Sequence, residues 1–189
     1  TSKLFYYTMI IDNFLSLKDW NFCYDFFKKD YWQFPSLSNI KGNQGWRIFN
    51  PDVEEKIGEK LYNRFTTCNE LDYHKIKTPY AVQRVGINGA TAMNESHLHQ
   101  DGTSKDLSLI WFGSKEWKKE WSGALQVHIN KEIHKISYVP NRAVIFNSHL
   151  FHMPETPTEK NKLRISVGLH LTPSPKWEYI YKPRIQKSA

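Results

Sequence analysis

The part of the chain that follows Pro79 consists of short runs of apolar, aromatic and β-branched residues separated by polar turns. Runs of this length and composition are typical of β-strands. Six of them can be delimited, at residues 80–87, 106–112, 123–129, 134–139, 142–146 and 163–171. Two stretches with helical spacing precede them. Helices followed by many short strands indicate an α+β protein whose larger part is an antiparallel sandwich or a closed jelly roll.

The N-terminal part of the chain predicts a strand followed by a helix. Residues 4–11 form an aromatic and β-branched run that we expect at one edge of a sheet. Ser16 is a suitable N-cap for the first helix. The apolar face of this helix would consist of Leu17, Trp20, Tyr24 and Phe27. Residues 31–43 are rich in Pro, Ser and Asn, so they predict an irregular segment.

A second helix is predicted to begin at Asn50 and Pro51, because Asn is a good cap and Pro is preorganised for the first helical turn. Its buried stripe would consist of Val53, Ile57, Leu61 and Phe65. Each of the two helices has a single apolar face, so we expect both of them to pack on one sheet.

Length and composition indicate a single domain. We expect a helical part at about residues 1–78, a jelly-roll core at about 79–173 and a C-terminal strap at 174–189, since 189 residues suffice for a two-layer core. No stretch has the roughly 20 consecutive apolar residues of a membrane span. Neither Cys23 nor Cys68 belongs to a CxxC pair. We therefore expect a cytoplasmic protein with no membrane contact, disulfide framework or thiolate zinc site.

The formal net charge of +7 is compatible with an acidic partner such as nucleic acid. The lysines, however, are scattered along the chain, for example at Lys28, Lys118, Lys162 and Lys187. A solvated basic surface is the better interpretation, and a nucleic acid partner is disfavoured.

Residues 97–102, HLHQDG, contain two imidazoles and a carboxylate close together. His99 and Asp101 are two positions apart, so on an extended strand their side chains point to the same face and can bind one ion. We assign Gly102 to turn geometry. The pair predicts a metal site that needs further ligands from elsewhere in the chain.

A third ligand is expected about fifty residues further on, in NRAVIFNSHLFHMP at 141–154. His149 and His152 compete for this role, and the spacing from the preceding strand favours His152. Two histidines and one carboxylate that leave the remaining positions open form the facial triad of non-haem Fe(II) oxygenases. A structural zinc site, by contrast, is closed by four ligands.

The run at 163–171 alternates apolar residues with Arg164, Ser166, Gly168 and His170. Both faces of such a strand are expected to be buried, and a buried arginine requires an anionic partner. Arg164 and Ser166 together offer a planar fork of donors and a hydroxyl, which suit the carboxylate of a ligand. A salt bridge to an internal Asp or Glu is the alternative.

With these residues the sequence resembles the Fe(II)- and 2-oxoglutarate-dependent oxygenases, in particular their prolyl 4-hydroxylase-like branch. The motifs that carry the resemblance are HQD at 99–101, SLIWFGSKEWKKEWSGALQVHI at 108–129, PNRAVIFNSHLFH at 140–152 and LRISV at 163–167. They stand in the order of the family, and the resemblance covers about residues 79–173.

The resemblance implies a double-stranded β-helix (jelly roll) in which His99, Asp101 and His152 bind Fe(II). Arg164, helped by Ser166, would hold the far carboxylate of 2-oxoglutarate. The implied activity is hydroxylation of an unactivated C–H bond with consumption of O2 and release of succinate and CO2, with ascorbate as an optional addition. One departure is that Trp111-Phe112 stands where prolyl hydroxylases often have a tyrosine that helps to hold the cosubstrate.

The prolyl-type resemblance favours a prolyl residue in a peptide or protein as substrate, and a free amino acid or another small molecule is the alternative. If the stretch at 111–122 framed the mouth of the site, Lys115, Lys118 and Lys119 would favour an anionic substrate. The same lysines are equally compatible with a solvated turn. The sequence does not predict an oligomeric state.

Other functions are less well supported by the sequence. A cupin-like protein would need a glutamate where Thr103 stands, and a nucleic-acid dealkylase would typically have a second arginine where His170 stands. A plain nucleic-acid-binding module without oxygenase activity would use exposed tryptophans as stacking platforms. Its candidates would be Trp46, Trp111, Trp117 and Trp121.

Overall fold

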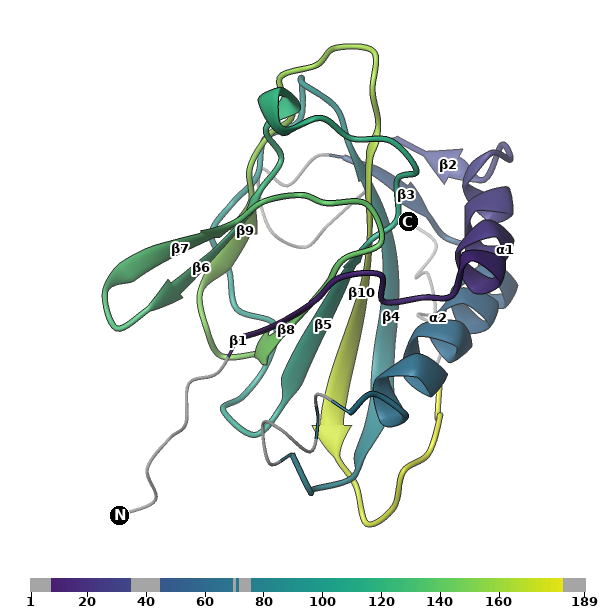
Figure 1. The fold of residues 1–189 in the computed structure, drawn as a ribbon, viewed down its shortest axis with the longest axis vertical. Coiled ribbons are helices and arrows are strands. Elements are labelled where there is room, and N and C mark those ends of the chain that lie inside the picture. The colour runs from purple at the N-terminus through teal and green to yellow at the C-terminus, as the bar shows by residue number, and fades with distance from the viewer. Residues whose placement is uncertain (1–7, 35–44, 70, 72–75, 182–189) are drawn as a thin grey trace, which may run out of the picture.

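The computed structural model describes residues 8–34, 45–69, 71 and 76–181. These residues form two antiparallel sheets and two α-helices (Figure 1). The larger sheet has the strand order β1 (Thr8–Ile11), β8 (Ala143–Asn147), β5 (Leu107–Phe112), β10 (Arg164–Pro173), β4 (Tyr80–Ala90), β3 (Trp46–Ile48) and β2 (Trp32–Gln33). The smaller sheet has the order β7 (Glu132–Ile136), β6 (Leu125–Ile129) and β9 (His152–Pro154).

The two sheets form a jelly roll, as predicted. Strands of both sheets contribute to one apolar cluster, which includes Phe112 and Phe146 from the larger sheet and Leu125 and Val127 from the smaller one. Figure 1 shows the smaller sheet on one side of the larger sheet and the helices on the other. The polar residues of the candidate site lie on the side of the larger sheet that faces the smaller one.

Helix α1 (Leu17–Phe27) begins after Ser16, whose hydroxyl accepts a 3.1 Å hydrogen bond from the backbone N–H of Asp19. Helix α2 (Pro51–Thr66) begins after Asn50, whose side chain accepts from the N–H of Val53 at 3.2 Å. Both predicted caps are therefore confirmed. The predicted face of α1 is wrong in one position, because Leu17 in the first turn is 69% exposed.

Several contacts join the helices to the larger sheet. The indole N–H of Trp20 donates to the carbonyl of Gly113 at 3.1 Å, and the ring of Phe27 lies 6.3 Å from that of Trp111. From α2, the hydroxyl of Tyr62 donates to the carbonyl of Tyr80 at 2.6 Å. These contacts occupy the face of the sheet opposite the candidate site.

The short strands differ most from the sequence-based expectation. Residues 31–43 were expected to be irregular, yet Trp32–Gln33 pair with β3 as strand β2. Residues 35–43, and residues 4–7 of the predicted first strand, lie outside the described part of the chain. The described part of that first strand, β1, is an edge strand paired with β8, as predicted. Strand β9 was not predicted, because three residues carry no recognisable alternation.

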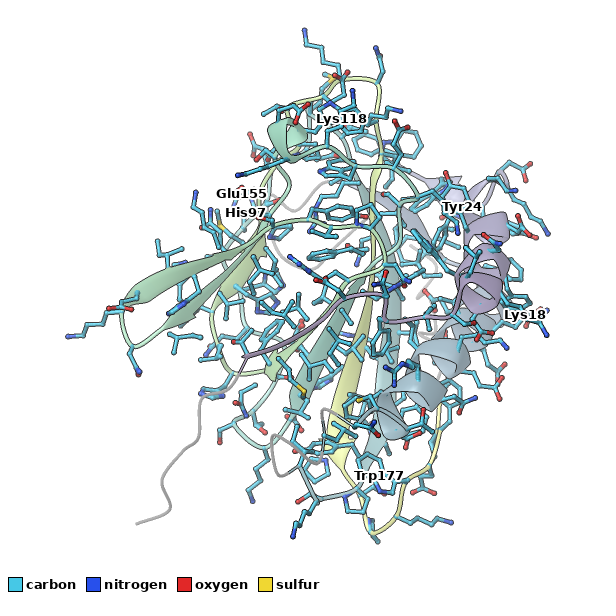
Figure 2. All side chains as sticks on the ribbon, viewed as in Figure 1. Lys18, Tyr24, His97, Lys118, Glu155 and Trp177 are labelled. Atoms are coloured by element: carbon cyan, nitrogen blue, oxygen red, sulfur yellow. The ribbon has the colours of Figure 1, made fainter. Side chains whose placement is uncertain are left out.

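The segment after β10 runs along α2. The ring of Trp177, labelled in Figure 2, lies 5.9 Å from that of Phe65, and the hydroxyl of Tyr179 donates to the carbonyl of Glu55 at 2.9 Å. Residues 182–189 of the predicted strap lie outside the described residues. In the part of the chain that the structure describes, neither helix has the length and apolar character needed to cross a membrane.

Candidate active site

His99, Asp101 and His152 bring one potential ligand atom each within 4.8 Å of the other two. Nε2 of His152 lies 3.5 Å from Oδ2 of Asp101, and Nε2 of His99 lies 4.0 Å from Oδ1. Among the described residues no other group of three such side chains comes together in this way. Two imidazole nitrogens and one carboxylate oxygen form a donor set for one transition-metal ion, with coordination positions left open.

The backbone holds the two segments of this cluster together. His99 and His152 exchange two main-chain hydrogen bonds, of 3.1 Å and 2.9 Å, and the N–H of Asp101 donates to the carbonyl of Ser148 at 2.9 Å. His152 is the first residue of β9, beside β6 in the smaller sheet. The relative positions of the ligand candidates therefore follow from strand pairing.

Hydrogen bonds to carbonyl groups orient both imidazoles. Nδ1 of His99 lies 2.9 Å from the carbonyl oxygen of His97, and Nδ1 of His152 lies 3.0 Å from that of Leu150. A carbonyl oxygen only accepts, so each Nδ1 carries the proton and each Nε2 keeps its lone pair for a ligand bond. Burial, with a contribution from His152, lowers the pKa of His99, which keeps its imidazole neutral at pH 7.

The carboxylate of Asp101 is held by two further side chains. Nη2 of Arg84 donates to Oδ1 at 2.8 Å, and the hydroxyl of Ser108 donates to Oδ2 at 3.0 Å. Burial by itself raises the pKa of Asp101. The contacts with His152, Arg84 and His99 outweigh burial and hold that pKa below its ordinary value, so the carboxylate is ionised at neutral pH.

Gly102 is required by a close approach rather than by turn geometry. Among the described glycines, Gly123 alone has a positive φ. A Cβ on Gly102 would lie 2.6 Å from Nε2 of His170 and 2.9 Å from Oδ2 of Asp106. A side chain at residue 102 would therefore displace the ends of the His170 and Asp106 side chains or the turn that carries Asp101.

Arg164, at the start of β10, is 2% exposed. Its Nε donates to the carbonyl of Gly123 at 2.7 Å and its Nη1 lies 3.4 Å from the hydroxyl of Ser166, while Nη2 has no hydrogen-bond partner among the described residues. Burial lowers the pKa of Arg164 to about 10, so the guanidinium is still charged at neutral pH. A buried cation with an unsatisfied donor indicates an anionic ligand.

A cavity of about 400 Å³ is lined by these two groups of residues together. Its lining includes His99, Asp101 and His152 as well as Arg164 and Ser166. The alternative for Arg164, a salt bridge to an internal carboxylate, is not found within the described residues.

Two aromatic rings pack against the guanidinium of Arg164. Its Cζ lies 5.3 Å from the ring centre of Phe112 and 4.9 Å from that of Tyr138, and these rings stack on each other at 4.5 Å. The hydroxyl of Tyr138 lies within hydrogen-bond distance of Ser114 and of the carbonyl of Ile165. The rings thus position the guanidinium, and the phenolic hydroxyl is engaged elsewhere.

The competing residues do not join the cluster of ligand atoms. His97 and His149 are absent from it, although the carbonyl of His97 orients His99 and the carbonyl of His149 accepts a hydrogen bond from Gln100. Lys115 packs on α1, where its Nζ lies 3.7 Å from the ring centre of Trp20. Lys115, Lys118 and Lys119 do not line the cavity, so the lysine-based reason for an anionic substrate fails.

Comparison with solved structures supports the fold. A prolyl hydroxylase from Trichoplax adhaerens, in complex with a hypoxia-inducible factor oxygen degradation domain peptide fragment, is 13% identical with a TM-score of 0.63, covering 88% of this chain and 83% of that chain. A prolyl-4-hydroxylase from Pseudomonas putida is 11% identical with a TM-score of 0.63, covering 89% and 94%. The non-haem α-ketoglutarate-dependent epimerase SnoN from nogalamycin biosynthesis is 8% identical with a TM-score of 0.64, covering 88% and 77%.

The chain therefore shares the fold of these three enzymes. This likeness confirms the fold that the resemblance implied. No protein-family model matches the sequence, and no curated protein matches it.

Sequence reasoning missed Arg84 and Ser108, which hold Asp101, and Arg47, which also lines the cavity. The signal used for Arg164 was present in two of these cases. Arg47 and Arg84 each interrupt a predominantly apolar strand, and such arginines are candidates for an inward-facing charge.

Proposed function

We propose that the protein is an Fe(II)- and 2-oxoglutarate-dependent dioxygenase that hydroxylates an unactivated C–H bond and releases succinate and CO2. The observation that carries the proposal is that one cavity contains both a two-histidine, one-carboxylate cluster and a buried arginine with an unsatisfied donor. Neither group alone distinguishes this function. Together they provide a place for a metal ion and for an anion that binds beside it.

In this proposal His99, Asp101 and His152 hold Fe(II). The donor set fits, because both Nε2 atoms carry lone pairs and the carboxylate is ionised at neutral pH. When bound, iron with dioxygen supplies the oxidising chemistry for attack on a C–H bond. The hydrogen bonds from Arg84 and Ser108 orient the carboxylate and limit its rotation.

Arg164 and Ser166 bind the carboxylate of 2-oxoglutarate that lies away from the metal. A guanidinium presents parallel N–H groups that match a carboxylate, and Nη2 is the donor still to be satisfied. The rings of Phe112 and Tyr138 pack against the guanidinium and help to hold it in place. Phe112 offers no hydroxyl, so the cosubstrate receives one hydrogen bond fewer than a tyrosine in that position would give.

Apolar side chains form part of the wall on the metal side of the cavity. The ring of Phe146 lies 4.8 Å from that of His152 and is fully buried. Ile110 and Leu125 line the cavity close by. An apolar wall of this kind lowers the local polarity and strengthens the electrostatic contacts beside it.

The first candidate substrate is a prolyl residue in a peptide or protein. It is supported by the fold likeness to two prolyl hydroxylases, one of which is in complex with a peptide fragment. A free amino acid or another small molecule on the same scaffold is the second candidate. We place the activity in a single cytoplasmic domain.

Succinate release tests the proposal. Purified protein is incubated with Fe(II), 2-oxoglutarate and oxygen while proline-containing peptides, free amino acids and single-stranded nucleic acid are supplied in parallel. We expect substrate-stimulated succinate formation that is lost in Asp101→Ala and strongly reduced in Arg164→Ala. The proposal would be contradicted if the wild-type protein formed no succinate with any of the supplied substrates. It would also be contradicted if only nucleic acid stimulated succinate formation.

The alternative from another class, a nucleic-acid-binding module, makes a different prediction. Such a module would bind single-stranded DNA or RNA without metal and with a strong dependence on salt. One of its proposed stacking residues, Trp111, is fully buried. Binding that persists in chelator and weakens steeply with salt would favour this alternative.

A further inference from the structure

Three arginine side chains line the cavity that contains the candidate metal ligands, namely Arg47, Arg84 and Arg164. Arg84 donates to Asp101, and Arg164 lies beside Ser166. The proposed function assigns no role to Arg47. This residue lies on β3, and β4 separates β3 from β10, the strand that carries Arg164.

Strand register directs Arg47 into the cavity. Arg47 pairs with Asn88 of β4, and the next residue, Ile48, pairs with Ile87. Ile48 and Ile87 are fully buried in the apolar core that includes both helices. Successive side chains of a strand point to opposite faces, so Arg47 and Asn88 face the cavity, and both line it.

The head group of Arg47 lies over the backbone of Gly86. A Cβ on Gly86 would be 3.3 Å from Nη2 of Arg47 and 3.7 Å from Nδ2 of Asn88. The guanidinium also lies 4.8 Å from the ring centre of Phe49, and Arg47 is 8% exposed. A guanidinium and a side-chain amide therefore converge at one place on the cavity floor.

Beside these donors the cavity floor is formed by glycine backbone without side chains. Gly86 of β4 pairs with Gly168 of β10, and both glycines line the cavity. A Cβ on Gly168 would have its nearest neighbour at 3.5 Å, in Ile110. Two neighbouring strands thus present no side chains here, which leaves room for a ligand next to Arg47.

The charges around the cavity favour an anion. Its lining contains the three arginines and two carboxylates, Asp101 and Glu95. Cationic side chains thus outnumber carboxylates in the lining, and such a lining attracts an anionic ligand.

We propose that Arg47, together with the amide of Asn88, binds a carboxylate of the substrate, which is a small free acid of the amino-acid type. The inference rests on the proposed function and selects the second of its two substrate classes. A guanidinium and an amide N–H₂ offer donors in the arrangement that a carboxylate accepts. In a residue within a peptide chain, the backbone carboxyl group is part of an amide bond. Such a residue therefore has no backbone carboxylate for Arg47 to bind.

Binding of matched probes tests the inference. The probes are the common free L-amino acids, the carboxamide of each, and N-acetylated proline peptides with amidated C-termini, with and without aspartate. Binding is measured by calorimetry and thermal stabilisation, in the presence of Fe(II) and 2-oxoglutarate without oxygen. At least one free acid should bind about tenfold more tightly than its carboxamide and more tightly than every capped peptide.

Arg47→Gln should reduce this preference for the acid by about tenfold while carboxamide binding changes little. In Gly86→Ala the added Cβ would contact the same guanidinium from the cavity floor, so this variant should also weaken acid binding. The inference can therefore still be tested if one of the two variants does not fold. Arg142→Gln is the matched control, because Arg142 pairs with Asp12 on the exposed surface and should leave the preference unchanged.

Equal binding of acids and carboxamides, binding of capped peptides alone, no binding of any free acid, or an unchanged preference in Arg47→Gln would each overturn the inference. The measurements are repeated without iron and 2-oxoglutarate. A protein that still prefers the free acid through Arg47 but does not bind iron and 2-oxoglutarate would contradict the proposed function alone.

Discussion

His99 and His152 lie far apart in the sequence but form a reciprocal pair of backbone hydrogen bonds, 3.1 Å and 2.9 Å long. This bridge joins the segment that carries Asp101 to the first residue of β9. The imidazole rings lie with their centres 4.4 Å apart. Main-chain hydrogen bonds therefore fix the spacing of the two segments that carry the ligand candidates.

Replacement of His152 by Ala should remove metal binding, whereas replacement of His149 should not. His152 contributes a ligand atom to the cluster and His149 does not. Loss of a group that only supports a ligand costs about 10- to 100-fold in metal affinity, so loss of a ligand should cost at least about 100-fold. Fe(II) binding under anaerobic conditions measures both variants. A greater loss in His149→Ala than in His152→Ala would show that the ligand was chosen wrongly.

Gly102→Ala should weaken metal binding by about tenfold through a steric effect. The added Cβ would lie 2.6 Å from Nε2 of His170 and 2.9 Å from Oδ2 of Asp106, so we expect it to push the turn that carries Asp101 away from these side chains. His170→Ala creates space, and the double variant should recover part of the lost affinity. Strictly additive effects of the two substitutions would argue against the clash.

Tyr138→Phe should destabilise the fold by about 1–3 kcal/mol, because it removes a buried hydroxyl and leaves its partners unsatisfied. That hydroxyl lies 2.8 Å from Oγ of Ser114 and 2.5 Å from the carbonyl oxygen of Ile165. The ring against Arg164 remains, so the affinity for 2-oxoglutarate should change only a few-fold. Urea denaturation and 2-oxoglutarate titration measure the two effects. An unchanged free energy of unfolding combined with a large loss of cosubstrate affinity would assign the hydroxyl to the cosubstrate instead.

The metal-free protein should lose stability as the pH falls below about 6.5. Burial, with a contribution from Arg84, lowers the pKa of His170, and burial also lowers that of His99. The unfolded chain therefore takes up protons at a higher pH than the folded chain, and protonation favours unfolding. Asp12 and Asp19, whose pKa values are also lowered, affect stability only below about their ordinary value of 3.8.

Thermal unfolding at about pH 7.5 and pH 5.5 measures this effect. His170→Gln should show a smaller decrease in melting temperature between the two conditions than the wild type. A wild-type melting temperature that rises on acidification would mean that these imidazoles take up protons more readily in the folded state.

Strand alternation predicted the most informative part of the site. In the run at 163–171 it separated the apolar residues from Arg164 and Ser166, and both of these line the cavity. Local signals also located the start of each helix, at Ser16 and Asn50. These features depend on residues close together in sequence, which is why they can be read without a structure.

Features that depend on distant contacts could not be predicted in the same way. Strands β2 and β9 have two and three residues, which is too short for a visible period. The glycine at position 102 is explained only by its approach to His170. The role of Arg84 requires knowledge that β4 brings it to Asp101. In each case the partner lies on another strand or turn.

Anaerobic absorption spectroscopy tests the central claim most directly. Fe(II) and 2-oxoglutarate are added together and separately to the wild-type protein and to His99→Ala. The account predicts one Fe(II) per wild-type chain and a weak visible charge-transfer band that requires both additions, and it predicts that His99→Ala shows neither. Iron and 2-oxoglutarate binding that remains intact in His99→Ala would contradict the assignment of the metal site.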